Sequence, residues 1–316
     1  MSRRARWLLG AGALVVVGLV AAVVSFTRHP LASLAAWQRR ALGKSGFTRQ
    51  ELGSGAERLV LFRAGNGPAL LFLHGLGDQA GSWGKVAAGL TGRYRVVLAD
   101  LPGHGESEPK AGPLTMATIV AGAERVFAEV ARDGPVIVVG NSLGAWVATI
   151  LAERHPQQAA RLVLVNGGAL RGQEEGLSLQ PRDRREAGAL VSRLRDPSSP
   201  PVPGFVLDDI VRQAASGPIA RLAGDLPGLE AHLLDDRLAA LTLPVDLLWG
   251  ASDRVVPLAY AERLQSALPA ARLTLLEHCG HVPQVECPER FGEKLAALLA
   301  EPPPATLSPV TPESPR

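Results

Sequence analysis

Residues 136–154, VIVVGNSLGAWVATILAER, decide the fold of this chain, because an apolar run meets a helical pattern at Gly140-Asn141-Ser142-Leu143-Gly144. A G-x-S-x-G pentapeptide between a strand and a helix predicts a sharp turn that presents the serine. Side chains two positions either side of the serine would collide with that strained turn, so glycine is needed at 140 and 144. We therefore expect Ser142 Oγ to stand clear of a sheet. The N–H of Leu143, at the start of a helix, would face a developing oxyanion.

Short apolar runs alternate with helical patterns along most of the chain. The expected strands are Arg58–Phe62, Ala69–Leu73, Arg95–Ala99, Val136–Val139, Leu162–Val165, Val245–Trp249 and Arg272–Leu275. The expected helices are Val86–Leu90, Leu114–Ala131, Ala145–Arg154, Leu258–Leu268 and Pro288–Leu299. Continuously apolar strands are typical of a mainly parallel sheet buried on both faces. The pattern predicts an open, doubly wound α/β sheet whose sites lie at the carboxyl ends of its strands.

One segment, residues 168–238, interrupts this alternation. It holds helical pieces at 184–194, 207–215 and 229–241 that are separated by prolines. At about 70 residues it is far longer than an ordinary connection, so we interpret it as a helical cap inserted over the site. The core would then consist of residues 57–167 and 239–300. Five arginines of the segment are interpreted as a solvated helix face, with a membrane or a polar substrate group as the alternative: Arg182, Arg184, Arg185, Arg193 and Arg195.

A serine nucleophile needs a base, normally a histidine that is oriented by a carboxylate. Asp253 follows the expected strand 245–249 through a glycine-containing turn, and His281 follows Gly280 after the last expected strand. Both would lie on the same edge of the sheet as Ser142. The competing candidates lack these placements: Asp225, Asp235, Asp236 and Asp246 for the acid, and His278 for the base. We predict Ser142 as nucleophile, His281 as base and Asp253 as acid.

Five motifs in this order make the chain resemble the α/β-hydrolase superfamily from about Leu59 to Leu299. They are His74-Gly75-Leu76-Gly77, the stretch Asp100 to Ser107, the Ser142 turn, the acid loop and the histidine loop. The resemblance implies that the N–H groups of Leu76 and Leu143 form an oxyanion hole. It implies supporting roles for His74, Gly75, Gly140 and Gly144. His104 is interpreted as a residue that shapes its loop, and Trp83 and Trp146 as core residues in preference to pocket walls.

The resemblance implies hydrolysis of a carboxylic ester through an acyl-enzyme, with no metal or organic cofactor. Similarity to monoacylglycerol lipases suggests a small, lipid-derived ester as substrate. The main alternative is carbon–carbon bond hydrolysis, since meta-cleavage-product hydrolases share the Gly-Asn-Ser pattern, although they usually have Trp where this chain has Val282. Ser142 argues against dehalogenases and epoxide hydrolases, which use Asp there. An alternative of another class is a non-catalytic, membrane-tethered binding protein on the same scaffold.

The amino terminus predicts a membrane anchor. Trp7 to Phe26 is a run of 20 uncharged residues, preceded by Arg3, Arg4 and Arg6, and as a helix it would span roughly 30 Å, the thickness of a bilayer core. We predict a cytoplasmic N-terminus and single-pass anchor in residues 1–28 and a connector in 29–56, with a cleaved signal peptide or a buried helix as alternatives. Basic residues flank both sides of the run, and we favour an extracytoplasmic catalytic domain.

Composition narrows the remaining possibilities. The net charge of +3 comes mostly from arginines scattered along the chain, so a nucleic-acid partner is not expected. Cys279 and Cys287 could bridge in an extracytoplasmic domain, but two unbridged thiols are the favoured interpretation. Residues 301–316 are rich in proline and poor in apolar residues, which predicts a disordered tail.

Overall fold

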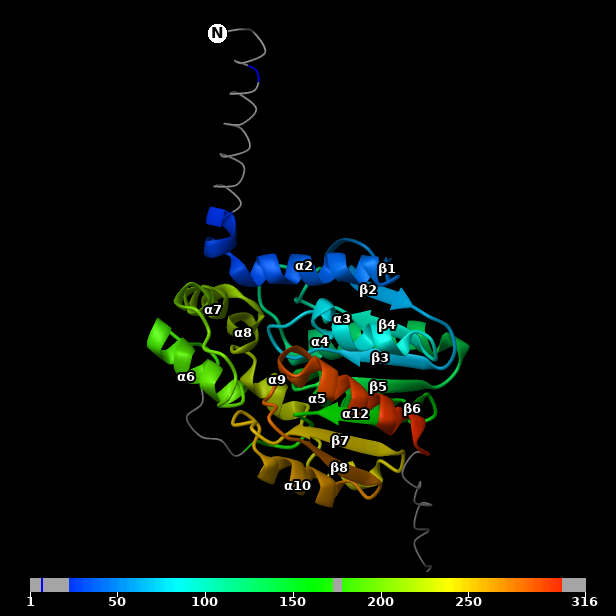
Figure 1. Cartoon of the computed structure of the whole chain (residues 1–316). Helices are drawn as coiled ribbons and strands as arrows, with labels where there is room; N and C mark the ends of the chain where they lie inside the picture. The colour runs from blue at the N-terminus through cyan, green and yellow to red at the C-terminus, as the bar shows by residue number, and fades with distance from the viewer. Residues whose placement is uncertain (1–6, 8–22, 173–177, 303–316) are drawn as a thin grey trace, which may run out of the picture.

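A mostly parallel, eight-stranded sheet forms the centre of the computed structural model, which describes residue 7 and residues 23–172 and 178–302. The strands are β1 Thr48–Leu52, β2 Leu59–Ala64, β3 Ala69–Leu73, β4 Arg95–Ala99, β5 Val136–Asn141, β6 Ala159–Val165, β7 Val245–Gly250 and β8 Ala271–Leu276. Their order is β1-β2-β4-β3-β5-β6-β7-β8 (Figure 1). The pairs β1–β2 and β2–β4 are antiparallel and all the others are parallel. The predicted mainly parallel, doubly wound α/β sheet is confirmed.

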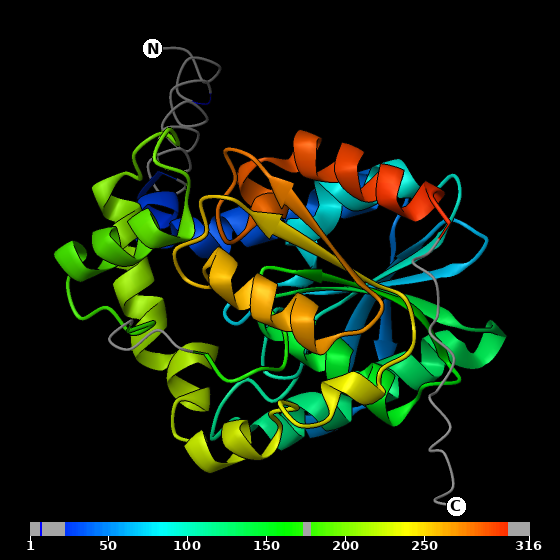
Figure 2. The ribbon, with the colours of Figure 1, turned by 90° about the horizontal axis from the view of Figure 1, so that it is seen from below.

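Helices cover both faces of this sheet (Figure 2). They are α2 Pro30–Lys44, α3 Gly84–Ala87, α4 Met116–Val130, α5 Leu143–Arg154, α6 Arg184–Leu194, α7 Gly204–Ser216, α8 Pro218–Leu222, α9 Leu226–Ala231, α10 Leu258–Ala267, α11 Pro283–Glu286 and α12 Pro288–Ala300. Short 3₁₀ turns lie at η1 Gly55–Glu57, η2 Ala80–Trp83, η3 Ala88–Leu90, η4 Ala131–Asp133 and η5 Leu238–Ala240.

The alternation of side chains along each strand divides the core into two layers. Leu71 packs in the layer that contains Phe127 of α4 and Leu151 of α5. Phe72, one residue later, packs in the opposite layer with Phe291 of α12. Successive side chains of a strand point to opposite faces, so a continuously apolar strand requires cover on both sides.

Every strand expected from the sequence is present, and one further strand was missed. β1 pairs with β2 at the edge of the sheet and lies within the segment 29–56, which was expected to be a connector. Its sequence, TRQEL, is polar and its side chains are mostly exposed, so no apolar run predicts a strand there. The helix expected at 229–241 also differs, because α9 ends at Ala231 and only the short turn η5 follows before β7.

Between β6 and β7, helices α6 to α9 gather on one side of the sheet (Figure 1). Two of the arginines singled out in this segment form exposed ion pairs: Arg182 with Glu186 at 2.7 Å and Arg184 with Asp208 at 2.6 Å. These pairs agree with the interpretation of a solvated face.

The predicted membrane span falls largely outside the described residues, which exclude 8–22. Within the part of the chain that the structure describes, no helix combines the length and the apolar character needed to cross a bilayer. Residues 23–28 are helical, His29 breaks the helix, and α2 starts at Pro30. The predicted disordered tail likewise lies outside the described residues from 303 onward.

Candidate active site

Ser142 occupies a strained turn between β5 and α5. Its backbone has φ 54° and ψ −116°, a conformation that residues other than glycine rarely adopt. A Cβ atom at Gly140 would lie 2.3 Å from the carbonyl oxygen of Gly144, and one at Gly144 would lie 2.2 Å from that of Leu73. Both positions therefore exclude a side chain, Gly140 because of the turn itself and Gly144 because of the neighbouring strand β3. A hydrogen bond from the Ser142 N–H to the Val165 carbonyl, 2.9 Å long, fastens the turn to β6.

The predicted acid and base are in direct contact. His281 Nδ1 lies 2.7 Å from Asp253 Oδ2, and both side chains are buried. The other carboxylate oxygen of Asp253 accepts hydrogen bonds from the N–H groups of Val255 at 2.8 Å and Val256 at 2.9 Å. A carboxylate held in this way accepts a hydrogen from Nδ1, which leaves Nε2 of His281 as the acceptor nitrogen of the neutral ring.

Asn141 joins the serine turn to the histidine loop. Its side-chain amide donates to the carbonyl oxygens of His281 at 3.0 Å and Val165 at 3.1 Å. Its Oδ1 accepts a hydrogen bond from Gln284 Nε2 at 3.1 Å. Because Asn141 directly precedes Ser142, these bonds hold the main chain of His281 next to the residue that presents the serine.

Asn166 makes a second connection, between the histidine loop and the end of β7. Its Nδ2 donates to the carbonyl of Gly280 at 2.7 Å, and its Oδ1 accepts from the N–H of Gly250 at 2.8 Å. The two loops touch so closely that a Cβ atom at Gly250 would lie 2.2 Å from the Gly280 carbonyl oxygen. The segment between β6 and β7 also contacts the histidine loop, since the His281 N–H donates to the carbonyl of Leu194 at the end of α6, 2.7 Å away.

Asn166 and Gln284 were not predicted from the sequence, and Asn141 was noted only as part of the turn motif. Asn141 and Asn166 each follow an apolar strand run directly, which is the only sequence signal for their position at the edge of the sheet. Their partners are more than 20 residues away in the chain, so the hydrogen bonds themselves leave no local pattern.

Cys279 and Cys287 form a disulfide around the histidine loop, so the favoured interpretation of two unbridged thiols was wrong. Their Cα atoms lie 6.0 Å apart across a separation of 8 residues. Cys279 lies within the loop between β8 and α11, and Cys287 lies immediately before α12. The turn of the chain through α11 brings the two cysteines together. Their spacing in the sequence did not predict a disulfide, because it does not reveal this turn.

His74 connects the loop that carries Leu76 to the loop after β4. Its Nε2 accepts a hydrogen bond from the Leu101 N–H at 3.0 Å, so Nδ1 carries the hydrogen and donates to the Gly75 carbonyl at 2.8 Å. Burial lowers the pKa of His74 to about 4, which keeps the ring neutral. Burial likewise lowers the pKa of His104 to about 3, and its Nδ1 lies 2.9 Å from the Pro102 carbonyl. Both histidines hold loops in shape.

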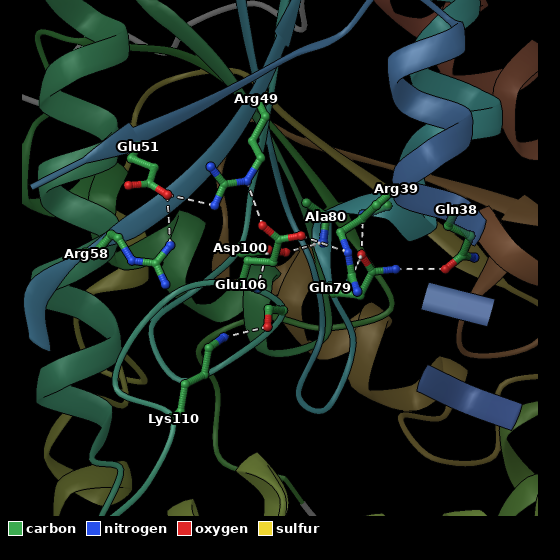
Figure 3. Close-up of polar contacts among 12 residues, drawn as sticks. Gln38, Arg39, Arg49, Glu51, Arg58, Gln79, Ala80, Asp100, Glu106 and Lys110 are labelled. Atoms are coloured by element: carbon green, nitrogen blue, oxygen red, sulfur yellow. Dashed lines mark hydrogen bonds and ion pairs between the residues drawn. The ribbon is translucent and has the colours of Figure 1, made fainter. Parts of the chain in front are cut away.

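The acidic side chains of Asp78 and Asp100 accept hydrogen bonds from the loop after β3, which carries Leu76. The Asp78 carboxylate accepts from the Gln79 N–H at 2.8 Å and from the Ser82 hydroxyl at 2.7 Å, and burial raises the pKa of Asp78 to about 6. Asp100 accepts from the Ala80 N–H at 2.7 Å (Figure 3). Gln79 also reaches α2, where its amide donates to the Gln38 side chain at 2.7 Å. The loop after β3 is therefore tied to both β4 and α2.

A largely apolar cavity of about 620 Å³ opens beside Ser142. Leu76, Leu143 and Trp146 line it on the sheet side, and residues of α8 and α9 such as Ile219 and Leu229 line it from the segment above. Among the described lining residues, Arg263 carries the only charged side chain. The expectation of core packing holds for Trp83, which is fully buried, but Trp146 is a wall of this cavity.

Three of the competing acid candidates make contacts with partners other than His281. Asp246 is buried in ion pairs with Arg161 at 2.6 Å and Arg272 at 2.8 Å. Asp225 accepts from the Met116 N–H, and Asp235 from the Arg171 N–H. His278 is exposed.

The chain is similar to a family of known sequences, to individual hydrolases and to solved structures. The model of the alpha/beta hydrolase family matches residues 70–294. A pimeloyl-[acyl-carrier protein] methyl ester esterase of Nitrosomonas europaea is 33% identical over 253 residues, covering 74% of this chain and 96% of that protein. A 2-hydroxy-6-oxononadienedioate/2-hydroxy-6-oxononatrienedioate hydrolase of Cupriavidus pinatubonensis is 28% identical, covering 79% and 89%. Among solved structures, a membrane phospholipase A described as a bacterial virulence factor superposes with a TM-score of 0.73 at 26% identity, covering 93% of this chain and 97% of its own.

Proposed function

Since the chain belongs to the alpha/beta hydrolase family, we propose that it is a serine hydrolase that cleaves carboxylic esters. Ser142 is the nucleophile, His281 the general base and Asp253 the residue that orients the base. The N–H groups of Leu76 and Leu143 form the oxyanion hole. The observation that carries this proposal is the 2.7 Å contact between His281 Nδ1 and Asp253 Oδ2, in a site where Ser142 holds a strained backbone beside an apolar cavity.

The proposed reaction starts with transfer of the Ser142 Oγ proton to His281 Nε2 as Oγ bonds to the ester carbonyl carbon. The carbonyl electron pair moves to the oxygen, where the two backbone N–H groups stabilise the negative charge. Leu143 suits this role because it is the first residue of α5, and the first N–H groups of a helix have no acceptor within the helix. Collapse of this intermediate breaks the bond to the alcohol, which takes the proton from His281. A water molecule, deprotonated by His281, then releases the acid and restores Ser142.

We propose a lipid-derived ester as the substrate class. The cavity beside Ser142 is lined mostly by aliphatic and aromatic side chains, and its volume suits an acyl chain. The similar membrane phospholipase A agrees with this class. We also propose that residues 1–28 contain a membrane anchor and that the catalytic domain lies outside the cytoplasm. The Cys279–Cys287 disulfide supports the second of these proposals, because disulfides persist in oxidising compartments.

A fluorophosphonate probe and short p-nitrophenyl esters test the proposed chemistry. We expect the purified protein to hydrolyse the esters and to be labelled at Ser142, and we expect Ser142→Ala to lose both properties. Ser266→Ala, which changes an exposed serine on α10, is the matched control and should keep both. Absence of labelling and of hydrolysis in the unmutated protein would refute the serine hydrolase and favour the binding protein.

Carbon–carbon bond hydrolysis stays the second candidate because of the similar dienedioate hydrolase. A panel that compares monoacylglycerols with ring-fission dienoates separates the two activities. Preference for the dienoates, measured as kcat/KM, would replace the ester assignment while leaving Ser142 as the reactive residue.

A further inference from the structure

Helix α2 exposes a stripe of apolar and basic side chains along one of its sides. Leu34 is 43% exposed and Trp37 is 58% exposed, and the side chains of Arg40 and Lys44 are also exposed. Residues at this spacing lie on one side of a helix. We call these four residues the outer stripe.

The opposite side of α2 is fixed to the body of the protein. Leu42 is 1% exposed in the core, Arg39 pairs with Glu106 at 3.0 Å, and Gln38 accepts the hydrogen bond from Gln79 (Figure 3). Because these contacts prevent rotation of the helix, the outer stripe must face away from the protein.

The start of α2 is also fixed, by helix α7. The Asp209 carboxylate accepts a hydrogen bond from the Leu31 N–H at 3.0 Å, in the first turn where negative charge is favourable. Phe26 contacts Phe205 of α7 with ring centroids 5.9 Å apart. Residues 23–28 rise from the start of α2 on the side away from the sheet, and α2 runs across this direction (Figure 1).

The charges along this part of the chain select the partner. The first acidic residue of the sequence is Glu51, whereas Arg28, Arg40 and Lys44 flank the exposed apolar residues. Two copies of the outer stripe would bring cations together without an acid to neutralise them. An anionic lipid surface offers opposite charge to the cations and an interface in which Trp side chains are favoured.

We propose that the outer stripe of α2 rests on an anionic lipid surface, with Leu34 and Trp37 inserted among the acyl chains and Arg40 and Lys44 at the headgroups. This inference depends on the membrane attachment that is part of the proposed function. It places α7, which packs against α2, close to the lipid from which a substrate would come.

A fluorophore at position 34 tests the inference in the full-length protein reconstituted in vesicles. The sequence has two cysteines, and both are in the disulfide, so Leu34→Cys gives a single reactive thiol. The matched control is Gln265→Cys on α10, an exposed position beside β8 at the other edge of the sheet from α2. The vesicles contain phosphatidylcholine with or without phosphatidylglycerol, and nitroxide-labelled acyl chains as quencher.

We expect the label at 34 to show blue-shifted emission and quenching by the nitroxide lipid, more strongly with phosphatidylglycerol, and the label at 265 to show neither. Arg40→Gln with Lys44→Gln should reduce the ratio of lipid-contacting to free label about fivefold for each cation. Arg132→Gln with Lys294→Gln removes the same charge at exposed positions elsewhere and should have no effect.

Two outcomes overturn the inference. A label at 34 that remains in water in both vesicle types shows that the stripe does not touch lipid. A label that is shielded from water but is not quenched by nitroxide lipid shows that a protein surface, such as a second copy, covers the stripe. Flotation of the same preparations with their vesicles reports separately on membrane attachment, and hydrolysis of short p-nitrophenyl esters reports on the proposed chemistry. A label at 34 that stays in water overturns the inference when the protein floats with the vesicles, whereas a protein that does not float contradicts the proposed attachment.

Discussion

The side-chain amide of Asn141 donates a hydrogen bond to the main-chain carbonyl of His281 at 3.0 Å, across 140 residues of sequence. This bond connects the residue before the proposed nucleophile to the proposed base. The relative position of Ser142 and His281 therefore depends on a side chain that takes no part in the reaction.

Replacement of Asn141 by alanine should impair the chemical step more than substrate binding. We expect kcat to fall about 10- to 100-fold with little change in KM, because a small displacement of the base suffices for such a loss. The buried groups left without partners should lower the free energy of unfolding by about 1–3 kcal/mol. Steady-state kinetics and urea unfolding measure the two effects, with Gln157→Ala at an exposed position as control. A rise in KM at constant kcat would contradict the positioning role.

Replacement of Asp253 by asparagine should reduce kcat by about 10⁴-fold. The Val255 and Val256 N–H groups both donate to Oδ1, so the asparagine oxygen would stay there and its NH₂ group would face His281. The ring would then hold its hydrogen on Nε2, which could no longer accept the Ser142 proton. Kinetics with a short ester tests this expectation. The control is Asp236→Asn, which removes the same charge from an exposed residue that does not contact His281, and this variant should keep normal kcat.

Removal of the disulfide by Cys279→Ser with Cys287→Ser should lower the free energy of unfolding by about 2–3 kcal/mol, because the bond closes a short loop in the unfolded chain. Urea unfolding measures this change. Reduction of the unmutated protein with dithiothreitol should lower its stability by the same amount, and an unchanged urea midpoint in both experiments would argue against the bond.

The partly buried carboxyl of Asp78 should make stability depend on pH between about 4 and 6. Burial raises its pKa from 3.8 to about 6, so the folded protein favours the protonated form. The corresponding stabilisation is complete below pH 3.8 and is lost as the pH rises through 6. Asn at 78 does not ionise, so the Tm of Asp78→Asn relative to the unmutated protein should increase from pH 4 to pH 7.

Thermal unfolding over this pH range measures the Asp78 effect. Asp236→Asn removes an exposed carboxyl, and its Tm difference should stay nearly constant with pH. A constant difference for Asp78→Asn as well would show that Asp78 ionises normally in the folded protein.

The sheet was predictable wherever burial left an apolar signal. Strands such as β3 and β7 are apolar because helices cover both of their faces, and their bounds follow the runs closely. β1 was missed for the converse reason, since an exposed edge strand needs no apolar side chains. Trp146 was assigned to the core because the sequence cannot tell a side chain packed against helices from one packed against a cavity.

The strand, turn and helix around Ser142 could be predicted from the sequence alone, because a sharp turn flanked by glycines is a local requirement. The sequence also indicated which residues follow the carboxyl ends of strands, and from these the candidates Asp253 and His281. The folded structure was needed to show that Asp253 and His281 touch and that Asn141 and Asn166 connect their loops. The same is true of the bridge between Cys279 and Cys287 and of the face of α2 that is left exposed. Each of these depends on contacts between segments distant in the chain, which local patterns of hydropathy do not record.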